Sequence, residues 1–91
     1  MLFRSLSRAY NDYLHDRFLR REPRLKGIAV LPLQDPAAAA LELRRAVKEY
    51  GMVGGLLPAD GLPHPLGHPE FYPIYEEASN LGCMLAVHSQ N

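Results

Sequence analysis

The sequence predicts an α/β fold in which helices and parallel strands alternate in the order α-β-α-β-α-β. Two apolar runs, at 28–31 and 83–87, are continuous instead of alternating, which is typical of strands covered on both faces of a parallel sheet. A stretch with helical periodicity precedes each predicted strand. Parallel strands joined by helical crossovers form either a doubly wound sheet or a barrel. The strand-to-strand repeats of about 28 and 31 residues are close to those of a (β/α)8 barrel.

The first helix and strand occupy the region before residue 32. Apolar residues at three- and four-residue steps predict an amphipathic helix over 4–21, and its expected buried face is Leu6, Tyr10, Tyr13 or Leu14, and Phe18. Pro23 ends this helix, because proline disfavours helical backbone in the residue before it. We then expect a strand over 25–31.

The second unit begins at Asp35 and Pro36, an N-cap acceptor followed by proline in the first helical turn, and its helix ends before Gly51. Arg45 and Glu49 are spaced to pair on the exposed side. A strand over 53–57 follows, and its two glycines suggest a close approach by another backbone or a ligand. The expected buried stripe of the helix is Ala40, Leu43, Val47 and Tyr50.

A loop over 59–70, rich in proline and glycine, leads to a third helix that opens near Pro73 and closes at Gly82. Its expected buried residues are Ile74, Ala78 and Leu81. The last strand, 83–87, runs directly into His88. Loop 59–70 and His88 should therefore lie at the same carboxyl edge of the sheet, where α/β barrels place their catalytic groups.

Composition excludes several classes of protein. Of the 91 residues, 47% are apolar, too many for a disordered chain, and no stretch is long enough to span a membrane. The single cysteine, Cys83, rules out an internal disulfide framework and suits a reducing, cytoplasmic compartment; a small core residue is its expected role. The sequence contains no phosphate-binding loop, dinucleotide fingerprint or serine-hydrolase elbow.

His88 is the leading candidate for chemistry, as a metal ligand or general base, since a neutral imidazole offers a nitrogen lone pair near pH 7. A histidine bonded to backbone at a strand end is the structural alternative. His64 and His68 are four apart, but the flanking prolines exclude a helix, so two solvated loop histidines are the simpler interpretation. They could still contact a substrate, because active sites of such folds are built from these loops.

The chain resembles the amidohydrolase-related family, the branch of the amidohydrolase superfamily that includes the aminocarboxymuconate-semialdehyde decarboxylases. The resemblance extends from about residue 9 to residue 89. It is carried by an ordered series of segments: 10–13, 23–27, 31–36, 42–47, 65–67, 73–78 and 85–88.

The resemblance implies a TIM-like barrel with a divalent metal, often zinc, that decarboxylates or hydrolyses small carboxylated or cyclic substrates. The family's metal site uses a His-x-His after the first strand, a histidine after a middle strand and an aspartate after the last. His88 matches the middle-strand histidine. Loop 59–69, with His64 and His68, and the segment after Leu33, with Gln34, would shape the pocket.

The chain contains no His-x-His, and the later ligands would lie beyond Asn91. We therefore expect residues 1–91 to be the central part of a barrel domain, without its first and last strands and inactive alone, since one imidazole cannot hold a metal. An alternative is a non-catalytic α/β remnant that self-associates through open sheet edges or pairs with a partner chain. The basic run from Arg17 to Lys26 is a weak argument for nucleic-acid binding, because the net charge is zero.

Overall fold

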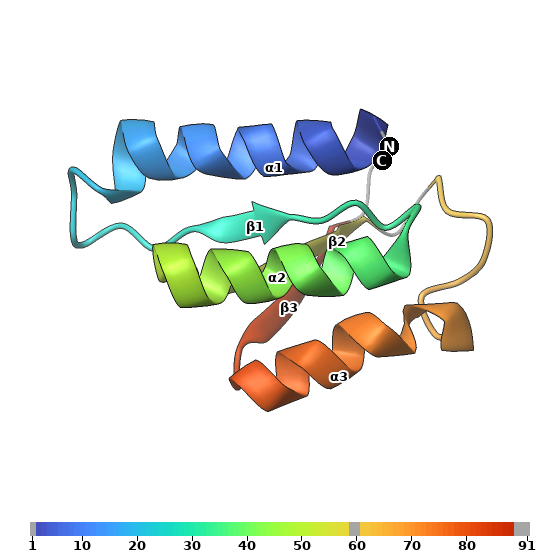
Figure 1. Ribbon diagram of the computed structural model, residues 1–91. Helices are drawn as coiled ribbons and strands as arrows, with labels where there is room; N and C mark the ends of the chain where they lie inside the picture. The colour runs from blue at the N-terminus through green and yellow to red at the C-terminus, as the bar shows by residue number, and fades with distance from the viewer. Residues whose placement is uncertain (1, 59–60, 89–91) are drawn as a thin grey trace.

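Three helices and three strands make up the computed structural model, which describes residues 2–58 and 61–88, with side chains from Ser5 onward (Figure 1). The elements in chain order are α1 (Leu2–Leu14), the π-helical turn η1 (His15–Leu19), β1 (Ile28–Val30), α2 (Pro36–Tyr50), β2 (Gly54–Pro58), the 3-10 turn η2 (Pro69–Phe71), α3 (Tyr72–Leu81) and β3 (Met84–His88). The order α-β-α-β-α-β is the predicted one. Loop 59–70 is also present, although positions 59 and 60 lie outside the described residues.

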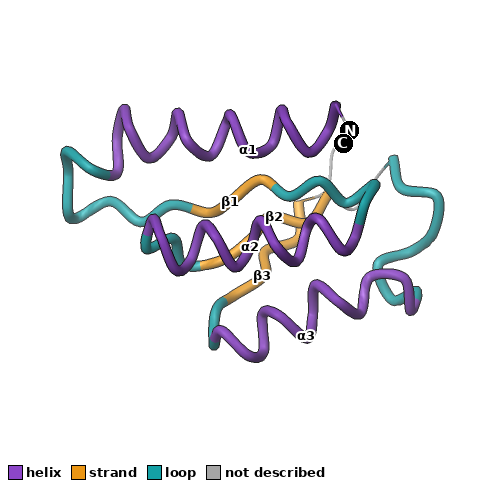
Figure 2. Tube along the Cα trace, viewed as in Figure 1, coloured by secondary structure: helices purple, strands orange, loops and turns teal. Residues whose placement is uncertain are grey.

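The strands form one parallel sheet in the order β1-β2-β3 (Figure 2). Ala29, Gly55 and Leu85 are in register across the three strands. A Cβ placed on Gly55 would contact the side chain of Leu43, so this set of positions faces α2. The alternate positions face the other side, which no described helix covers in Figure 1.

The core lies between the sheet and helices α2 and α3. Phe71, Leu33, Leu43 and Ile74 are its largest fully buried apolar side chains. Of the residues expected to be buried, Leu43, Ile74 and Ala78 are, while Ala40, Val47, Tyr50 and Leu81 are half-buried.

The expected buried face of this first helix is wrong except at Leu14, which packs against the core. Leu6, Tyr10 and Tyr13 of α1 and Phe18 of η1 are between 46% and 57% exposed, and Ser7 and Asn11 are buried instead. Asn11 is completely buried because its side-chain amide finds hydrogen-bond partners there. Apolar periodicity located the helix but selected the wrong stripe. The helix also ends earlier than predicted, through the π-helical turn.

The ends of α2 follow the prediction. The Asp35 side chain accepts a hydrogen bond from the Ala38 amide at 3.2 Å, and Gly51 has φ of +67° at the C-cap. The Arg45–Glu49 pair is wrong, because Arg45 turns inward and pairs with Glu42 at 2.8 Å and Asp12 at 2.9 Å. A buried carboxylate one turn away is the stronger partner for a guanidinium that leaves water.

The strands are shifted or shorter than predicted. β1 holds only Ile28–Val30, since the Leu25 amide bonds to the Glu22 carbonyl in a turn and Leu25 itself is exposed. The expected close approach at the glycines is confirmed: a Cβ on Gly54 would lie 2.0 Å from the Met84 carbonyl oxygen.

Cys83 is half-buried against the core, and burial raises the pKa of its thiol, which disfavours the reactive thiolate. Among the described residues, no helix combines the length and apolar character needed to cross a membrane.

Candidate functional site

The predicted site residues all follow the carboxyl ends of strands. Gln34 comes after β1, loop 61–70 comes after β2, and His88 is the last residue of β3. Because the strands are parallel, these ends share one edge of the sheet. The sheet therefore presents the three predicted groups at a common edge.

His88 projects from the uncovered face of the sheet. It is in register with Pro58, three positions beyond the Gly55–Leu85 pair, so its side chain points away from α2. The imidazole is exposed. An exposed imidazole at a strand end, on a face that no described helix covers, is suited to binding a metal or a substrate from that side.

Gln34 lies in the turn between β1 and α2. The turn is closed by the Asp35 amide bonding to the Pro32 carbonyl at 2.9 Å, and it is anchored by Leu33, which is 2% exposed. The Gln34 side chain is exposed at this turn. Its amide is available to a ligand at the carboxyl edge.

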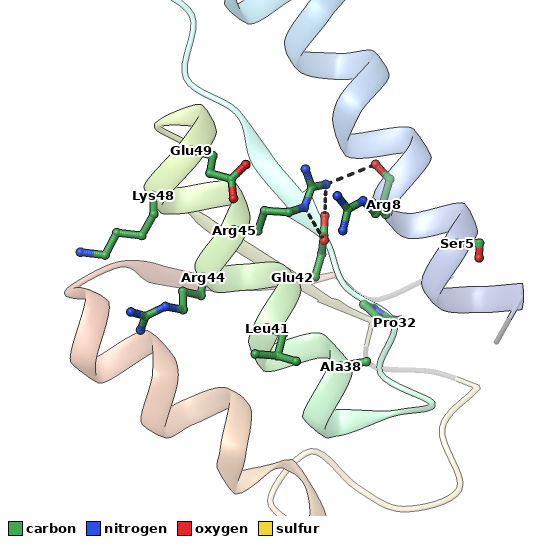
Figure 3. Close-up of a pocket in the computed structure, with 10 residues that line it drawn as sticks. All are labelled: Ser5, Arg8, Pro32, Ala38, Leu41, Glu42, Arg44, Arg45, Lys48 and Glu49. Carbon is green, nitrogen blue, oxygen red and sulfur yellow. Dashed lines mark hydrogen bonds and ion pairs between the residues drawn. The ribbon is translucent and has the colours of Figure 1, made fainter.

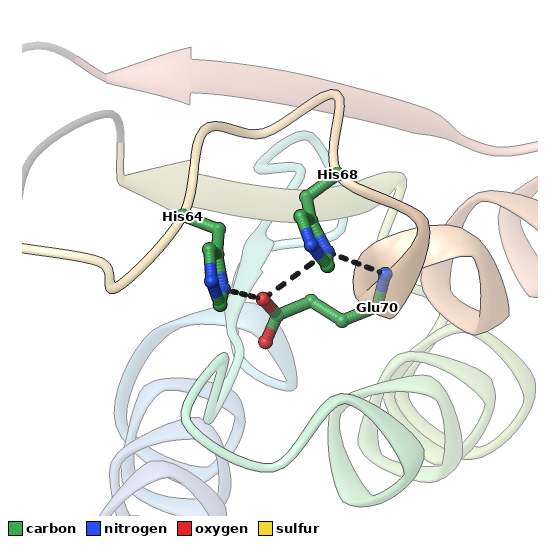
Figure 4. Close-up of side chains that lie close together, drawn as sticks. All are labelled: His64, His68 and Glu70. Atoms are coloured by element: carbon green, nitrogen blue, oxygen red, sulfur yellow. Dashed lines mark hydrogen bonds and ion pairs between the residues drawn. The ribbon is translucent and has the colours of Figure 1, made fainter.

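His64 and His68 do not behave as two independent solvated histidines. Their rings stack with centroids 4.1 Å apart, and both face the Glu70 carboxylate (Figure 4). His64 Nδ1 is hydrogen-bonded to Glu70 Oε2, and His68 Nδ1 lies 3.3 Å from the same oxygen. The backbone between them is a loop, as predicted. Sequence reasoning missed Glu70, which the 3-10 turn η2 folds back over the two rings.

A cavity of about 880 Å³ opens between α1 and α2, on the side of the chain that carries the helices (Figure 3). It contains none of the predicted site residues. Its lining is Ser5, Arg8, Pro32, Ala38, Leu41, Glu42, Arg44, Arg45, Lys48 and Glu49.

The electrostatics beside this cavity are those of a structural network. The Tyr50 hydroxyl donates to Asp12 at 2.6 Å and, with Arg45, holds the pKa of that carboxyl below its usual range. The same hydrogen bond raises the pKa of Tyr50. Arg45 also donates to Glu42 and to the Arg8 carbonyl. These hydrogen bonds hold α1 against α2. The cavity beside them is separate from the predicted site, because none of the predicted site residues at the strand ends lines it.

Two arrangements of described residues could bind a metal. His88 offers one ligand at the end of β3, whereas His64, His68 and Glu70 offer three ligand atoms within 4.8 Å of one another. One imidazole is too few for a stable site. His88 could serve only together with ligands from other residues.

Comparison with known proteins places this geometry in context. The sequence model of a family described as Amidohydrolase matches residues 2–90. Gamma-resorcylate decarboxylase of Rhodococcus jostii (strain RHA1) is 39% identical over 95 residues, a match covering 94% of this chain and 29% of the relative. The 2-amino-3-carboxymuconate-6-semialdehyde decarboxylase of Dictyostelium discoideum is 29% identical over 83 residues, covering 91% and 23%.

Solved structures give the same result. The crystal structure of a dihydroxybenzoic acid decarboxylase from Polaromonas sp. JS666, with bound manganese and the inhibitor 2-nitroresorcinol, matches with a TM-score of 0.85 and 33% identity, covering 97% of this chain and 28% of that one. These matches confirm the expected α-β-α-β-α-β segment of a TIM-like barrel. The chain spans less than a third of the length of the relatives it matches.

Proposed function

Because this chain belongs to the amidohydrolase family, we propose that residues 1–91 form the central part of a metal-dependent barrel enzyme that removes a carboxyl group from a small aromatic acid. The observation that carries the proposal is His88: an exposed imidazole at the carboxyl end of β3, on the uncovered face of the sheet. It supports a metal ligand better than a structural histidine, since no hydrogen bond ties the imidazole to the described backbone.

His88 would contribute one ligand to a divalent metal, and the remaining ligands would come from other parts of the enzyme. A metal held by His88 and those ligands would polarise a substrate oxygen or lower the pKa of a bound water. Zinc was the expected metal. The manganese in the Polaromonas enzyme supports a divalent ion without favouring zinc, so we propose a divalent transition metal and leave manganese and zinc to the test.

The reaction proposed is a decarboxylation and not a hydrolysis, because all three relatives described above are named decarboxylases. The bond between the ring carbon and the carboxylate breaks, CO2 leaves, and the electron pair stays on the ring carbon. A proton derived from water then takes the place of the carboxylate. In this reaction Gln34 and loop 61–70, with His64 and His68, would hold the substrate at the carboxyl edge.

A second candidate is a non-catalytic remnant that self-associates. The observation in its favour is the exposed apolar row formed by Leu6, Tyr10 and Tyr13 of α1 and Phe18 of η1. A cytoplasmic location and the absence of nucleic-acid binding stay predictions under either proposal.

A chimera tests the enzymatic proposal. The matching segment of the Rhodococcus jostii decarboxylase would be replaced by this chain, and CO2 release from gamma-resorcylate would be followed with and without Mn²⁺ or Zn²⁺. We expect metal-dependent activity that His88→Ala lowers at least about 100-fold, since loss of a ligand should exceed the loss caused by a supporting residue. Val87→Ala, the neighbour on the opposite face, is the matched control and should retain activity.

An active chimera in which His88→Ala changes nothing would contradict the role of His88. Independently, the DNA on both sides of this reading frame can be sequenced. An in-frame His-x-His upstream, with a histidine and a strand-end aspartate downstream, would support the enzyme. Genuine start and stop signals without them would favour the remnant.

A further inference from the structure

We propose that His64, His68 and Glu70 form a binding site for a divalent transition metal such as Zn²⁺ within the loop that follows β2. The three ligand atoms, two imidazole nitrogens and one carboxylate oxygen, converge within 4.8 Å although no regular helix spans them (Figure 4). Two histidines and a glutamate are a recurring protein ligand set for zinc, with water completing the coordination. This proposal goes beyond the proposed decarboxylase and does not depend on His88.

The electron pairs in this group favour a cation. His68 Nδ1 accepts a hydrogen bond from the Glu70 amide at 3.1 Å, so that nitrogen carries a lone pair and no proton. The same nitrogen lies 3.3 Å from Glu70 Oε2, which is also an acceptor. A proton on His64 Nδ1 can satisfy the carboxylate on one side only. A metal ion would accept an electron pair from each of the three groups, at His68 either through Nε2 or through Nδ1 with the Glu70 amide displaced.

The loop holds the three groups in place before any ion binds. Prolines at 63, 65 and 69 flank both histidines and restrict the backbone. The His68 amide bonds to the Pro65 carbonyl at 2.9 Å, and the Tyr75 hydroxyl of α3 donates to the Leu66 carbonyl. Because little conformational freedom is left to lose, the entropic cost of assembling the site is small.

The ligand set also selects the kind of metal. Imidazole nitrogens suit Zn²⁺, Co²⁺, Ni²⁺ and Cu²⁺, whereas Mg²⁺ and Ca²⁺ prefer sites made wholly of oxygen. The His64 side chain is 50% exposed and that of Glu70 29% exposed, so an ion can enter from solvent and keep bound water. Binding would place a positive charge in loop 61–70, at the edge of the sheet where Gln34 and His88 lie.

The test titrates the 91-residue chain with Zn²⁺ alone, in parallel with Mg²⁺, by calorimetry and by NMR of the histidine side chains. We expect one Zn²⁺ per chain, with signals of His64, His68 and the Glu70 amide moving and that of His15 unchanged. His64→Ala, His68→Ala and Glu70→Gln should each weaken binding at least about tenfold. His88→Ala should leave the affinity unchanged, which separates this site from the proposed active-site metal.

Thermal unfolding gives a second readout. A saturating concentration of Zn²⁺ should raise the Tm of the native chain, and the rise should vanish in Glu70→Gln. Circular dichroism of each variant without metal verifies that it is folded. The proposal is overturned if Zn²⁺ at about 1 mM does not bind, since this concentration is the weak end of the range of dissociation constants of protein metal sites. It is equally overturned if the three substitutions leave the affinity intact or if Mg²⁺ binds as well as Zn²⁺.

Discussion

The side chain of Asn11 bonds to both backbone polar groups of Val30, as a neighbouring strand would. Its Oδ1 accepts from the Val30 amide at 2.9 Å, and its Nδ2 donates to the Val30 carbonyl at 2.9 Å. The same Nδ2 reaches Glu42 Oε2 at 2.8 Å, so one buried amide joins α1, β1 and α2. A helix side chain thereby occupies part of the exposed edge of β1, the kind of edge that otherwise invites pairing with another chain.

Asn11→Ala should destabilise the chain by about 2–4 kcal/mol, because it leaves the Val30 groups and the Glu42 carboxylate buried without this partner. Urea unfolding measures the effect. Asn80→Ala is the matched control: Asn80 is exposed on α3, and its replacement should change the free energy of unfolding by less than about 0.5 kcal/mol. Equal effects of the two substitutions would show that the Asn11 bonds contribute nothing.

Gly54→Ala should separate β2 from β3. The added Cβ would lie 2.0 Å from the Met84 carbonyl oxygen, and a strand backbone cannot move aside without breaking the ladder. We expect a loss of at least about 1–3 kcal/mol, the usual cost of overpacking. Gly67→Ala is the control, since a Cβ there meets nothing within 4 Å and should be tolerated. Thermal unfolding of both variants measures the loss of stability. A Gly54→Ala chain as stable as the control would contradict the register of β2 against β3.

Asp12 should make stability depend on acid pH. Its pKa is lowered by the Tyr50 hydrogen bond and by Arg45, so the unfolded chain takes up the proton first as the pH falls. The stabilisation is complete above the ordinary carboxyl pKa of 3.8 and is lost as the pH falls through the lower value of the folded state. Asp12→Asn should therefore cost stability at pH 7 and progressively less below pH of about 4.

The measurement compares urea midpoints of the two chains between neutral and acid pH. Tyr50→Phe provides a second arm: without the hydroxyl the folded-state pKa of Asp12 rises toward its ordinary value, so the acid loss should be smaller and complete at a higher pH. A difference between wild type and Asp12→Asn that stays constant with pH would refute the linkage.

The exposed apolar row of α1 should drive self-association of the 91-residue chain. Replacing Tyr10 and Tyr13, both more than half exposed, by serine should shift sedimentation velocity profiles toward the monomer. Leu41→Ser, at a still more exposed apolar position on α2, is the control and should leave the distribution unchanged. A native chain that is already monomeric at high concentration would remove the basis for association through this face.

The 91-residue chain by itself should not release CO2 from gamma-resorcylate with any divalent metal. His88 supplies a single ligand at the strand edge, and a catalytic metal requires about three protein ligands. The measurement is an assay of CO2 release by the purified chain in the presence of Mn²⁺ or Zn²⁺. Metal-stimulated turnover would show that the described residues already contain a working site.

Local signals in the sequence were sufficient where one residue determines one conformation. Asp35 and Pro36 fixed the start of α2, and Gly51 and Gly82 fixed two helix ends through left-handed backbone. The signals failed where the deciding partner lies far along the chain. Asn11 is buried because Val30 and Glu42 satisfy it, and helical periodicity weighs only apolarity.

The candidate site divides in the same way. The position of His88 at a strand end followed from the apolar run before it, since parallel strands end at one edge. The meeting of His64 and His68 over Glu70 could not be predicted, because it depends on a 3-10 turn and on proline-fixed loop geometry that has no periodicity to detect.

Because side chains alternate along each strand, the two faces of this sheet place different constraints on the residues they carry. Ala29, Gly55 and Leu57 lie on the side that faces the helices and are buried, so mutations there are constrained by packing. Pro58 and His88 lie on the other side, where packing against α2 imposes no constraint. Substitutions at Pro58 and His88 should thus leave the packing against α2 intact, whereas substitutions at Ala29 and Leu57 should disturb it, so the outer side of the strand ends can change without eroding the stability held by the other side.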